Sequence, residues 1–525
     1  MKLITLLLLI HLISSIIAFG QVTEEWARTY NAGVNTSDNA NALTQDASGN
    51  IYVTGSADGN IVTIKYNPQG AELWTAVYNG PANWKDEGFA IKSDDMGNIY
   101  ITGISYVDTS YDIITIKYNS SGVEQWNTLY EYSEGYFDKA ICISIGEDGS
   151  VYIAGGSNFS YDWRYLTIKY NSSGVLQWVA DYDAVASGIE FANSMEIDGN
   201  GFIYVTGISD DHFATVKYNS SGTEMWSARY HGPGNGFCYA QCLQLDGSGN
   251  VYVTGKAQDS LDAVHITTIK YNNAGVSQWT RFNSMGGTPN DMTLDNSGNI
   301  IITGTQNYDY ITLKYDPQGN ELWSKLYNGP QNRSDFSYAV AVDNQDNVYV
   351  TGTVNFISGI INKSDIGTLK LDSDGNEVWS KIYNGVGDST DAGADIIVDT
   401  SYNVYITGSS VGINTASDYT TIKYSQTIGI QQISSQIPAS FNLHQNYPNP
   451  FNPSTIIRFD IPSGELVSLK IYNSLGQEVA NLVNKELTAG SYKYIFDGSD
   501  LSSGVYFYTL KTKDFIDSKK MLLVK

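Results

Sequence analysis

Residues 46–80 read DASGNIYVTGSADGNIVTIKYNPQGAELWTAVYNG, and variants of this stretch fill the chain from about residue 22 to residue 425. Its tryptophan, Trp74, has equivalents about every 50 residues along the chain. These equivalents are Trp26, Trp126, Trp178, Trp226, Trp279, Trp323 and Trp379. Self-similarity at a fixed period indicates one supersecondary unit that is copied along the chain, so the fold follows from the unit.

Each copy of the unit predicts four short strands that are separated by turn residues. An Ala-rich strand such as 338–343 comes first, and the other three are 51–55, 63–67 and 72–78 in the copy that contains Trp74. We name them strands A, B, C and D in that order. β-Branched and aromatic residues alternate in all four, and both faces are apolar. Such strands suit blades that stand side by side around an axis, because each blade then covers its neighbours.

The order of the strands predicts how the ring closes. The chain begins with a lone strand D near 23–30, continues through seven complete blades, and ends with strands A, B and C near 391–424. Pairing the first strand with the last three completes an eighth blade and hides two open sheet edges. We therefore predict an all-β, eight-bladed β-propeller in which Trp26 shares a sheet with residues 421–424.

The first residues of the chain have the features of a signal peptide. Lys2 provides a positive start, 3–17 is mostly apolar, and Ala18-Phe19-Gly20 offers small residues for cleavage. This apolar run is short for a membrane span and no later run is long enough, so we predict no transmembrane segment after signal removal. Loss of Lys2 leaves 29 Lys and Arg residues against 55 Asp and Glu residues, a net charge of −26 that makes nucleic acid a poor partner.

The sequence predicts neither a disulfide framework nor a metal site or cofactor. Cys238 and Cys242 lie four residues apart on one predicted strand, about 13 Å from each other and beyond the reach of a disulfide, and Cys142 is the third cysteine. Segments of the form Asp-x-x-Gly-Asn, such as 46–50 and 246–250, leave calcium binding open as an alternative. We favour a hairpin turn there, because Asp at the first position and Gly at the fourth are typical of one.

The repeat stops at Tyr424, and a different module follows. The proline-rich segment 446–453 cannot be a central strand, and five alternating runs after it predict a small Ig-like β-sandwich. The expected organisation is a signal peptide at 1–20, the propeller at 21–425, a linker at 426–440 and the C-terminal sandwich at 441–525.

Two parts of the chain resemble known families. The phrases Gly-Asn-Ile-Tyr-Val-Thr-Gly and Thr-Ile-Lys-Tyr-Asn resemble the bacterial β-propeller repeat family SBBP over roughly 22–425, which implies a propeller and little more. The tail closely resembles the type A C-terminal sorting domain of the type IX secretion system of Bacteroidota. Its motif residues are Tyr447, Pro448, Asn449, Pro450, Phe451, Gly476, Gly504 and Tyr506. A carbohydrate-binding sandwich is the alternative for the tail.

The resemblance of the tail implies a route and a location for the protein. It implies export to the periplasm by the signal peptide, followed by passage across the outer membrane through the type IX secretion machinery, which would be a partner. The protein would then be secreted or held at the cell surface, with or without cleavage of the tail.

The connections between the strands differ in how much they vary. Turns A–B and C–D are nearly uniform, whereas loops B–C and D–A vary in length and content and emerge together at the other end of each antiparallel blade. Exposed aromatic side chains in such loops are platforms for sugar rings or peptide side chains. The candidate ligand-binding residues there are Trp84, Trp163, Tyr106, Tyr161 and His231. The alternative is that they pack the loops against one another.

One loop position changes its chemistry around the ring. Three residues before the Thr of strand C stand Asn60, Asp112, Arg164, His212, His265, Asp309, Asp365 and Asp418. Arg164, His212 and His265 thus form a basic arc on an acidic ring, which adds them to the candidates as residues that face an anionic group. Surface variation without a function is the alternative. A metal shared between these positions is not expected, because strands C of neighbouring blades diverge from the axis.

Familiar catalytic patterns such as His-Glu-x-x-His, a P-loop or Cys-x-x-Cys are missing from the sequence. We expect a secreted or cell-surface binding module that recognises a glycan, a peptide or a surface polymer through its variable loops, rather than an enzyme. Two alternatives stay open, namely an extracellular polysaccharide hydrolase or lyase on a propeller scaffold, and a structural or adhesive surface protein.

Overall fold

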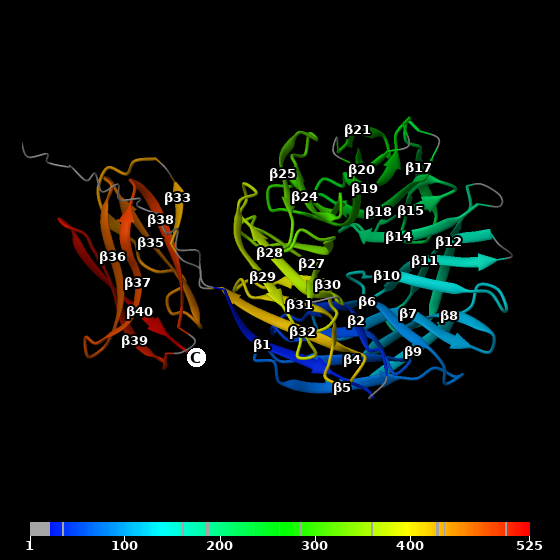
Figure 1. The fold of residues 1–525 in the computed structure, drawn as a ribbon, viewed down its shortest axis with the longest axis horizontal. Helices are drawn as coiled ribbons and strands as arrows, with labels where there is room; N and C mark the ends of the chain where they lie inside the picture. Colours follow the sequence, from blue (N-terminus) through cyan, green and yellow to red (C-terminus); the bar gives the residue numbers. More distant parts are fainter. Residues whose placement is uncertain are drawn as a thin grey trace, which may run out of the picture. The chain divides into compact units, whose positions relative to one another are not determined.

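The computed structural model describes residues 22–525 except 34–35, 160–161, 185–187, 235, 262, 284–285, 359–360, 427–429, 435 and 499–500. Within these residues the fold is all-β, with ten four-stranded sheets and no helix (Figure 1). The predicted signal peptide at 1–20 and the candidate Tyr161 lie outside the described residues.

The chain forms two compact units. One spans Glu24–Ser425 and the other contains Gln426–Lys525. Eight of the sheets lie in the first unit and two in the second. The finer domain limits, at 21–425, 426–440 and 441–525, stay predictions.

Seven blades consist of four strands that are consecutive in the chain and pair in chain order. The first four blades are β2 (Asn39–Gln45), β3 (Ile51–Ala57), β4 (Asn60–Tyr66) and β5 (Glu72–Tyr78); β6 (Asp86–Ser93), β7 (Ile99–Val107), β8 (Ser110–Tyr118) and β9 (Glu124–Tyr130); β10 (Asp138–Ile145), β11 (Val151–Phe159), β12 (Asp162–Tyr170) and β13 (Leu176–Tyr182); and β14 (Glu190–Ile197), β15 (Ile203–Ser209), β16 (His212–Tyr218) and β17 (Glu224–Tyr230).

The next three blades have the same arrangement. They are β18 (Cys238–Leu245), β19 (Val251–Gln258), β20 (Val264–Tyr271) and β21 (Ser277–Phe282); β22 (Thr288–Leu294), β23 (Ile300–Gln306), β24 (Asp309–Tyr315) and β25 (Glu321–Tyr327); and β26 (Phe336–Val342), β27 (Val348–Ser358), β28 (Ile361–Leu371) and β29 (Glu377–Tyr383).

The eighth blade joins the two ends of the ring. It consists of β30 (Asp391–Val398), β31 (Val404–Val411), β32 (Ser417–Gln426) and the first strand of the chain, β1 (Val22–Tyr30). β1 pairs with β32. In Figure 1 the blue ribbon of β1 therefore lies beside the yellow ribbon of β32, although the two come from opposite ends of the propeller sequence. This confirms the predicted fold class and the shared sheet of Trp26 and residues 421–424.

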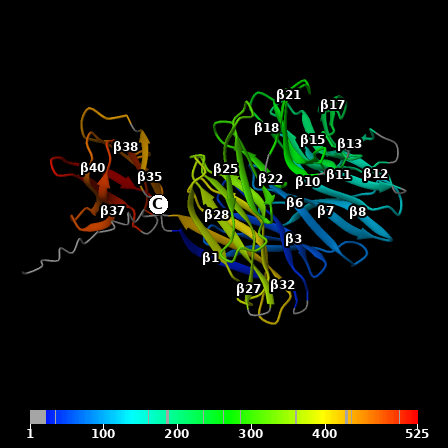
Figure 2. The ribbon, with the colours of Figure 1, turned by 45° about the horizontal axis from the view of Figure 1, so that its top comes forward.

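The innermost strands form an unbroken circle. Each strand A contacts the strand A of the next blade, and β30 contacts β2, so the last blade meets the first. Figure 2 shows the blades following one another around the ring from β3 through β10 and β18 to β28. A closed ring leaves no sheet edge at either end of the repeat, which removes a template for aggregation.

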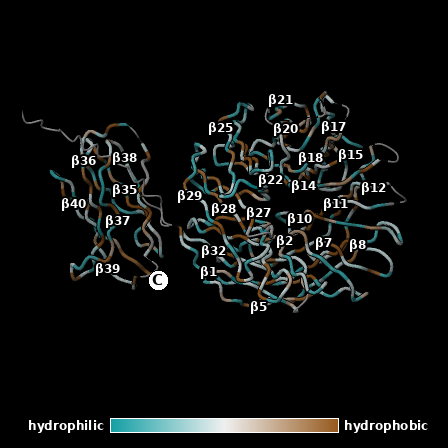
Figure 3. Tube along the Cα trace, in the orientation of Figure 1, coloured by the Kyte–Doolittle hydropathy of each residue, from teal (hydrophilic) through white to brown (hydrophobic). Residues whose placement is uncertain are grey.

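The core of the propeller lies between the blades. All seven residues of β3 are buried, and hydrophobic segments run along the strands in Figure 3. Tyr52 and Ile61 of the first blade pack with Ile99 and Ile101 of the second blade in one apolar cluster. Burial of a large apolar side chain contributes about 1.5–3 kcal/mol to stability, so strands B and C must be apolar on both faces.

The repeated tryptophan joins each blade to the next. Trp74 Nε1 donates to the carbonyl oxygen of Ser120 at 3.1 Å, and Lys65 Nζ donates to the same oxygen at 3.0 Å. The indole also covers Gly122, where an added Cβ would lie 2.6 Å from Trp74 Cδ2. Gly122 has a φ of 79°, so the turn needs glycine both for its backbone and for the tryptophan.

The second unit is a sandwich of two four-stranded sheets, as predicted. One sheet has the order β33-β38-β35-β34 and the other β37-β36-β39-β40. Their bounds are β33 (Gln431–Ser434), β34 (Asn442–Leu443), β35 (Ser454–Ile461), β36 (Glu465–Asn473), β37 (Glu478–Leu487), β38 (Gly490–Asp497), β39 (Gly504–Lys511) and β40 (Ile516–Leu523). Ile457 and Phe459 from one sheet share a single core with Leu469 and Tyr508 from the other. β33 lies within the stretch that was expected to be a linker.

Candidate functional site

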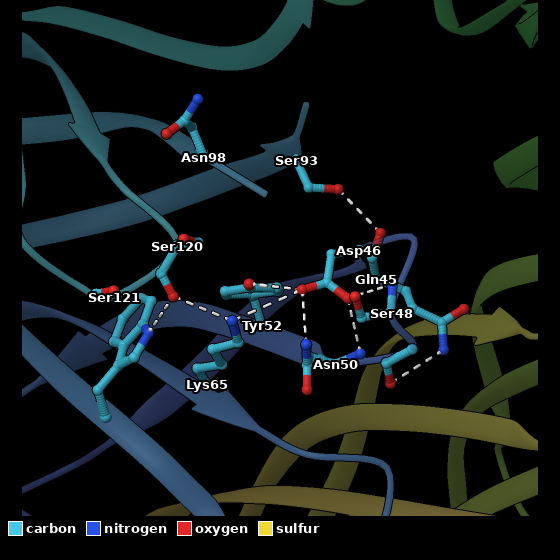
Figure 4. Close-up of polar contacts among 12 residues, drawn as sticks. Gln45, Asp46, Ser48, Asn50, Tyr52, Lys65, Ser93, Asn98, Ser120 and Ser121 are labelled. Atoms are coloured by element: carbon cyan, nitrogen blue, oxygen red, sulfur yellow. Dashed lines mark hydrogen bonds and ion pairs between the residues drawn. The ribbon is translucent and has the colours of Figure 1, made fainter. Parts of the chain in front are cut away.

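Turns A–B and C–D lie at one end of every blade, which we call the uniform side. Figure 4 shows turn A–B of the first blade. Asp46 Oδ1 accepts from the backbone N–H of Ser48 and of Asn50, each at 2.9 Å. Asp46 Oδ2 accepts from Asn50 Nδ2 and from the Tyr52 hydroxyl, each at 2.8 Å. Burial raises the pKa of Asp46, but these hydrogen bonds outweigh burial and hold the pKa below its usual value.

The carboxylates of these turns accept hydrogen bonds from groups within the protein. Asp94, Asp246 and Asp399 accept from the equivalent backbone, Asn and Tyr groups of their own turns. A calcium loop instead points about 6–8 oxygen atoms at one ion. Across the part of the chain that the structure describes, no group of three or more His, Cys, Asp and Glu side chains could hold a metal ion. The hydrogen bonds that these carboxylates accept are those of a structural turn.

Loops B–C and D–A lie at the opposite end of every blade, which we call the variable side. Large apolar side chains are exposed there in the loops of most blades. They are Trp84, Ile189, Phe237, Leu261, Tyr308, Val386 and Ile413. Trp84 is 65% exposed and begins a series of aromatic contacts on this side.

This series, the aromatic ladder, crosses three blades. Its members in order are Trp84, Tyr106, Tyr111, Phe137, Trp163 and Phe191. The distances between successive ring centroids are 6.3, 5.1, 5.5, 5.9 and 5.6 Å. From Tyr106 onward the rings meet edge to face, and these five are half-buried. Edge-to-face contacts are favourable, so the ladder also stiffens the loops that carry it.

The ladder brings together three of the predicted ligand-binding residues, Trp84, Tyr106 and Trp163. The repeat pattern did not single out Phe137 and Phe191, which also belong to the ladder. Phe137 directly precedes β10, and Phe191 is the second residue of β14. Each lies one residue before or after the acidic residue that begins strand A of its blade, Asp138 or Glu190, and the repeat pattern alone assigns no neighbour to this position.

Arg164 does not face solvent as an unpaired cation. Its guanidinium forms an ion pair with Asp183, and Nη1 lies 4.0 Å from Asp181 Oδ2. The Tyr132 hydroxyl lies close to the same Asp181 carboxylate, within hydrogen-bond reach. Arg164 therefore belongs to a polar cluster beside the ladder, with two acidic partners for one basic group.

The three candidate histidines lie in two different settings. His212 and His231 have ring centroids 4.7 Å apart. His265 is separate, because its Nε2 lies 2.9 Å from Asp259 Oδ2 and its Nδ1 lies 2.8 Å from the Asn283 carbonyl oxygen. Burial lowers the pKa of His265, but these two acceptors outweigh burial and raise its pKa. The structure thus pairs two histidines that the sequence places 19 residues apart.

Acidic residues at the start of strand A hold the variable loops in shape. Asp86 accepts from the N–H of Gly80 at 2.6 Å and from the N–H of Tyr106 at 3.2 Å. Asp335 and Asp391 accept in the same way from the loops around them. These carboxylates tie loop D–A to loop B–C and thereby position the base of the ladder.

A second set of acids, at the start of strand C, has no such partners. Burial, followed by the charges of Glu131 and Asp138, raises the pKa of Asp112 to about 7. Burial and the charge of Asp391 raise the pKa of Asp365 to about 7 in the same way. Within the described residues, Oδ1 of Asp112 and of Asp365 is buried without a hydrogen-bond partner. The loop position that varies around the ring is therefore electrostatically strained in these blades.

A Gly-x-Ser-x-Gly pattern occurs at 408–412. In a hydrolase this pattern places the serine on a sharp turn between a strand and a helix. Here Ser410 lies in strand β31, is 2% exposed and pairs across the sheet with Asp391 and Asp418. The pattern is therefore part of a blade and does not form a nucleophile elbow.

The motif residues of the tail pack its proline-rich segment onto the sandwich. Phe451 is buried, and its N–H donates to the Leu522 carbonyl oxygen at 2.9 Å. Asn449 Oδ1 accepts from the Leu522 N–H at 2.9 Å. Tyr447, Pro448 and Pro450 flank these contacts in the same segment, and Tyr447 is exposed.

The other motif residues lie in turns and strands of the sheet that contains β39. Gly476 has a φ of 74° in the turn between β36 and β37. Gly504 begins β39, and the Tyr506 hydroxyl donates to the Ser502 carbonyl oxygen at 2.8 Å. These positions explain why the motif combines glycines with a buried aromatic residue.

Comparison with protein families gives two matches. The model of the secretion system C-terminal sorting domain matches residues 445–525, and the SBBP β-propeller repeat model matches residues 25–61 and 322–356. No curated protein matches the sequence. Among the described residues, no helix is long and apolar enough to cross a membrane.

Several solved structures are similar to this chain. PorZ, a surface component of the type-IX secretion system of Porphyromonas gingivalis, is 13% identical with a TM-score of 0.41, and the alignment covers 91% of this chain. This chain spans 64% of the length of PorZ. A streptogramin B lyase is 11% identical with a TM-score of 0.42, and the alignment covers 76% of this chain and 97% of the lyase. A Lactobacillus plantarum protein is 15% identical with a TM-score of 0.39 over 54% of this chain and 82% of its own.

The blades and the tail thus carry the features of both matched families. The sorting domain directs export through the type IX secretion system to the cell surface or the medium. Residues 25–61 and 322–356 of the propeller thus match the SBBP β-propeller repeat, and residues 445–525 match the secretion system C-terminal sorting domain.

Proposed function

We propose that the propeller is a non-enzymatic module that binds a glycan chain on its variable side. The observation that carries this proposal is the aromatic ladder, which runs across three blades and ends in the exposed ring of Trp84. Indole and phenol rings offer apolar faces to the C–H groups of sugars, and tyrosine adds a hydroxyl group. A rigid ring that displays such side chains on loops is a common arrangement for recognition.

Polar groups beside the ladder support a polymer with many hydroxyl groups. Asp181, Asp183 and Arg164 form a cluster next to Trp163, and Glu87 accepts from Asn41 Nδ2 at 3.1 Å near the Trp84 end. Carboxylates and amides are the usual partners of sugar hydroxyls. The excess of acids over bases favours a neutral or basic chain over an acidic polysaccharide, because like charges repel. Arg164 is already paired with Asp181 and Asp183, which makes it a weaker candidate for binding an anionic group.

The ladder also suggests how long a ligand would be. Its contacts run from Trp84, between β5 and β6, to Phe191 in β14, so they cross the second and third blades and reach the fourth. A ligand that followed it would be an extended chain and not a single sugar. Peptides share some of this chemistry, and a peptide library serves as the comparison in the test.

The test is a glycan array and a peptide array probed with the full chain. We expect binding to one or more neutral glycans, and a loss of about tenfold or more in affinity in Trp84→Ala with Trp163→Ala, which corresponds to about 1.4 kcal/mol. Met96→Ala is the matched control, because Met96 is 77% exposed and lies in a turn on the uniform side. Equal binding by the double variant and the unmodified chain would show that the ladder is not the site.

A melting curve of each variant separates lost binding from lost folding. Trp163 is half-buried and contacts Phe137 and Phe191, so its removal is expected to lower stability somewhat. Trp84→Ala alone removes an exposed ring and is expected to leave the melting temperature unchanged. If the chain bound peptides in place of glycans, the proposed class of ligand would be wrong, but the ladder would still be the binding site.

A further inference from the structure

We infer that His212 and His231 form a two-histidine site for a divalent transition metal ion on the variable side of the fourth blade. His212 is the first residue of β16, and His231 directly follows β17. The two strands pair with Phe213 opposite Tyr230, so the sheet register places the two histidines opposite each other at its end. This inference goes beyond the proposed glycan binding and does not depend on it.

The hydrogen bonds of the two rings fix their tautomers. His212 Nδ1 lies 2.6 Å from the Asp210 carbonyl oxygen, and His231 Nδ1 lies 2.8 Å from the Gly232 carbonyl oxygen. A carbonyl oxygen can only accept a hydrogen bond, so each Nδ1 carries the proton. In the neutral ring the lone pair then lies on Nε2, the atom that would bind a metal. Metal-bound histidines commonly donate their other N–H to a carbonyl or carboxylate in this way.

The distance between the rings suits a shared ion. With a metal about 2.1 Å from each Nε2, and each nitrogen about 1.2 Å from its ring centre, angles of about 90–109° at the metal place the ring centres roughly 4.7–5.4 Å apart. The observed separation of the centroids is 4.7 Å, with an angle of 55° between the ring planes. No hydrogen bond to either Nε2 is found within the described residues, so both nitrogens are available.

Acidic groups outnumber basic groups beside the pair. The Arg229 guanidinium donates to the carbonyl oxygen of Ser209, the sheet partner of His212, at 2.8 Å, and two carboxylates of the preceding turn stand against this one cation. Asp210 and Asp211 lie in the turn that precedes His212, and the chain as a whole is strongly acidic. No third His, Cys, Asp or Glu side chain joins the pair in a metal-binding group among the described residues, so water or a ligand atom would complete the coordination. Imidazole nitrogen prefers Zn²⁺, Cu²⁺ or Ni²⁺, whereas Mg²⁺ and Ca²⁺ prefer oxygen.

His265 provides a natural contrast within the same ring. It occupies the equivalent position of the next blade, but both of its ring nitrogens already have partners in Asp259 and the Asn283 carbonyl oxygen. A lone imidazole with both nitrogens engaged offers no open ligand position. Binding that depends on His212 and His231 but not on His265 would therefore report the pair itself.

The test is a calorimetric titration of Zn²⁺ into the untagged full chain in the presence of excess Mg²⁺, which occupies the surface carboxylates. We expect one Zn²⁺ per chain, with an affinity that falls by about tenfold or more in His212→Gln and in His231→Gln. His265→Gln is expected to bind as the unmodified chain does. A second readout is the Cu²⁺ electron paramagnetic resonance spectrum, in which splitting from two nitrogens is expected and is reduced in either variant.

Two results would overturn the inference. Unchanged Zn²⁺ affinity in His212→Gln and His231→Gln would show that any bound ion sits elsewhere. An equal loss in His265→Gln would show that histidines contribute without a specific pair. Glutamine keeps much of the size of histidine, and a melting curve of each variant without metal verifies that the blade is intact.

Discussion

Lys423 donates a hydrogen bond from Nζ to the carbonyl oxygen of Pro68 at 3.1 Å, although 355 residues separate the two. Trp26 Nε1 donates to the same oxygen at 3.2 Å. Lys65 and Trp74 join the first blade to the second in the same way, because both donate to the carbonyl oxygen of Ser120. The closing blade thus makes the same contact with the first blade as an ordinary blade makes with its neighbour, even though its tryptophan comes from the other end of the chain.

The first prediction concerns this closure. Trp26 is 7% exposed and covers Gly70, so Trp26→Ala removes a buried indole and its hydrogen bond and leaves β1 poorly anchored. We expect the free energy of unfolding of the propeller to fall by about 3–5 kcal/mol. Urea unfolding followed by circular dichroism measures it. Trp84→Ala is the control, because that indole is exposed, and a loss in Trp26→Ala as small as in the control would mean that β1 does not hold the ring shut.

The second prediction separates the two reasons for glycine in the turns of the uniform side, with Gly122 in turn C–D of the second blade and Gly201 in turn A–B of the fourth. Gly122 and Gly201 have φ values of 79° and 78°, but an added Cβ meets Trp74 at 2.6 Å in the first case and nothing within 4 Å in the second. Gly122→Ala is expected to be less stable than Gly201→Ala by about 1–3 kcal/mol, the cost of overpacking. Melting curves and urea unfolding compare them. Equal losses would assign the requirement to the backbone alone.

The architecture was readable from the sequence because each blade solves the same packing problem. Tryptophan, lysine and glycine recur since one blade's Trp74 and Lys65 must meet the next blade's turn around Gly122. The incomplete first and last copies then implied the closing strand, and the pairing of β1 with β32 confirms it. Period and strand order are local properties of a repeat, so a single sequence carries them.

The candidate site was only partly readable, because its contacts cross between copies. Trp84 and Trp163 stood out as tryptophans outside the period, but Phe137, which extends the ladder toward Trp163, did not. Arg164 seemed a basic residue on an acidic ring, yet its partner Asp183 directly follows β13, in the loop D–A that leads to the next blade. Such pairs depend on strand register and on the distance between neighbouring loops, neither of which the pattern of one copy contains.

The third prediction concerns pH. Burial, with the charges of Asp391 and Asp388, raises the pKa of Asp365 to about 7, above the unfolded value of about 3.9. The folded chain therefore holds this proton more tightly, and the stability that it contributes is present at acidic pH and is lost as the pH rises through about 7. This loss begins above the unfolded pKa of about 3.9, so Asp365→Asn is expected to raise the melting temperature more at pH 8 than at pH 5.

Asparagine is a natural choice at this position, because Asn60 occupies it in the first blade. Melting temperatures between pH 5 and pH 8 measure the effect, and the slope over that range should be smaller in Asp365→Asn than in the unmodified chain. Asp374→Asn, at an exposed position on the uniform side, is the control for the loss of one charge. Parallel curves for Asp365→Asn and the unmodified chain would show that this carboxyl group does not titrate with folding.

The fourth prediction concerns the proline-rich segment of the sorting domain. Tyr508 is fully buried, and its hydroxyl accepts from the Asn446 N–H at 2.7 Å and donates to the His444 carbonyl oxygen at 2.8 Å. Burial raises the pKa of Tyr508 to about 12, so the hydroxyl keeps the proton that it donates. Tyr508→Phe leaves both backbone groups without this partner, at a cost of about 1–3 kcal/mol.

Hydrogen exchange locates this loss in the chain. Amide exchange in residues 444–451 is expected to be about tenfold to a hundredfold faster in Tyr508→Phe, because each 1.4 kcal/mol is a factor of ten in the opening equilibrium. Tyr506→Phe is the matched control, since the Tyr506 hydroxyl donates to Ser502 within its own turn and does not touch this segment. If exchange there is as slow in Tyr508→Phe as in the control, Phe451 and Asn449 hold the segment against β40 without help from the tyrosine.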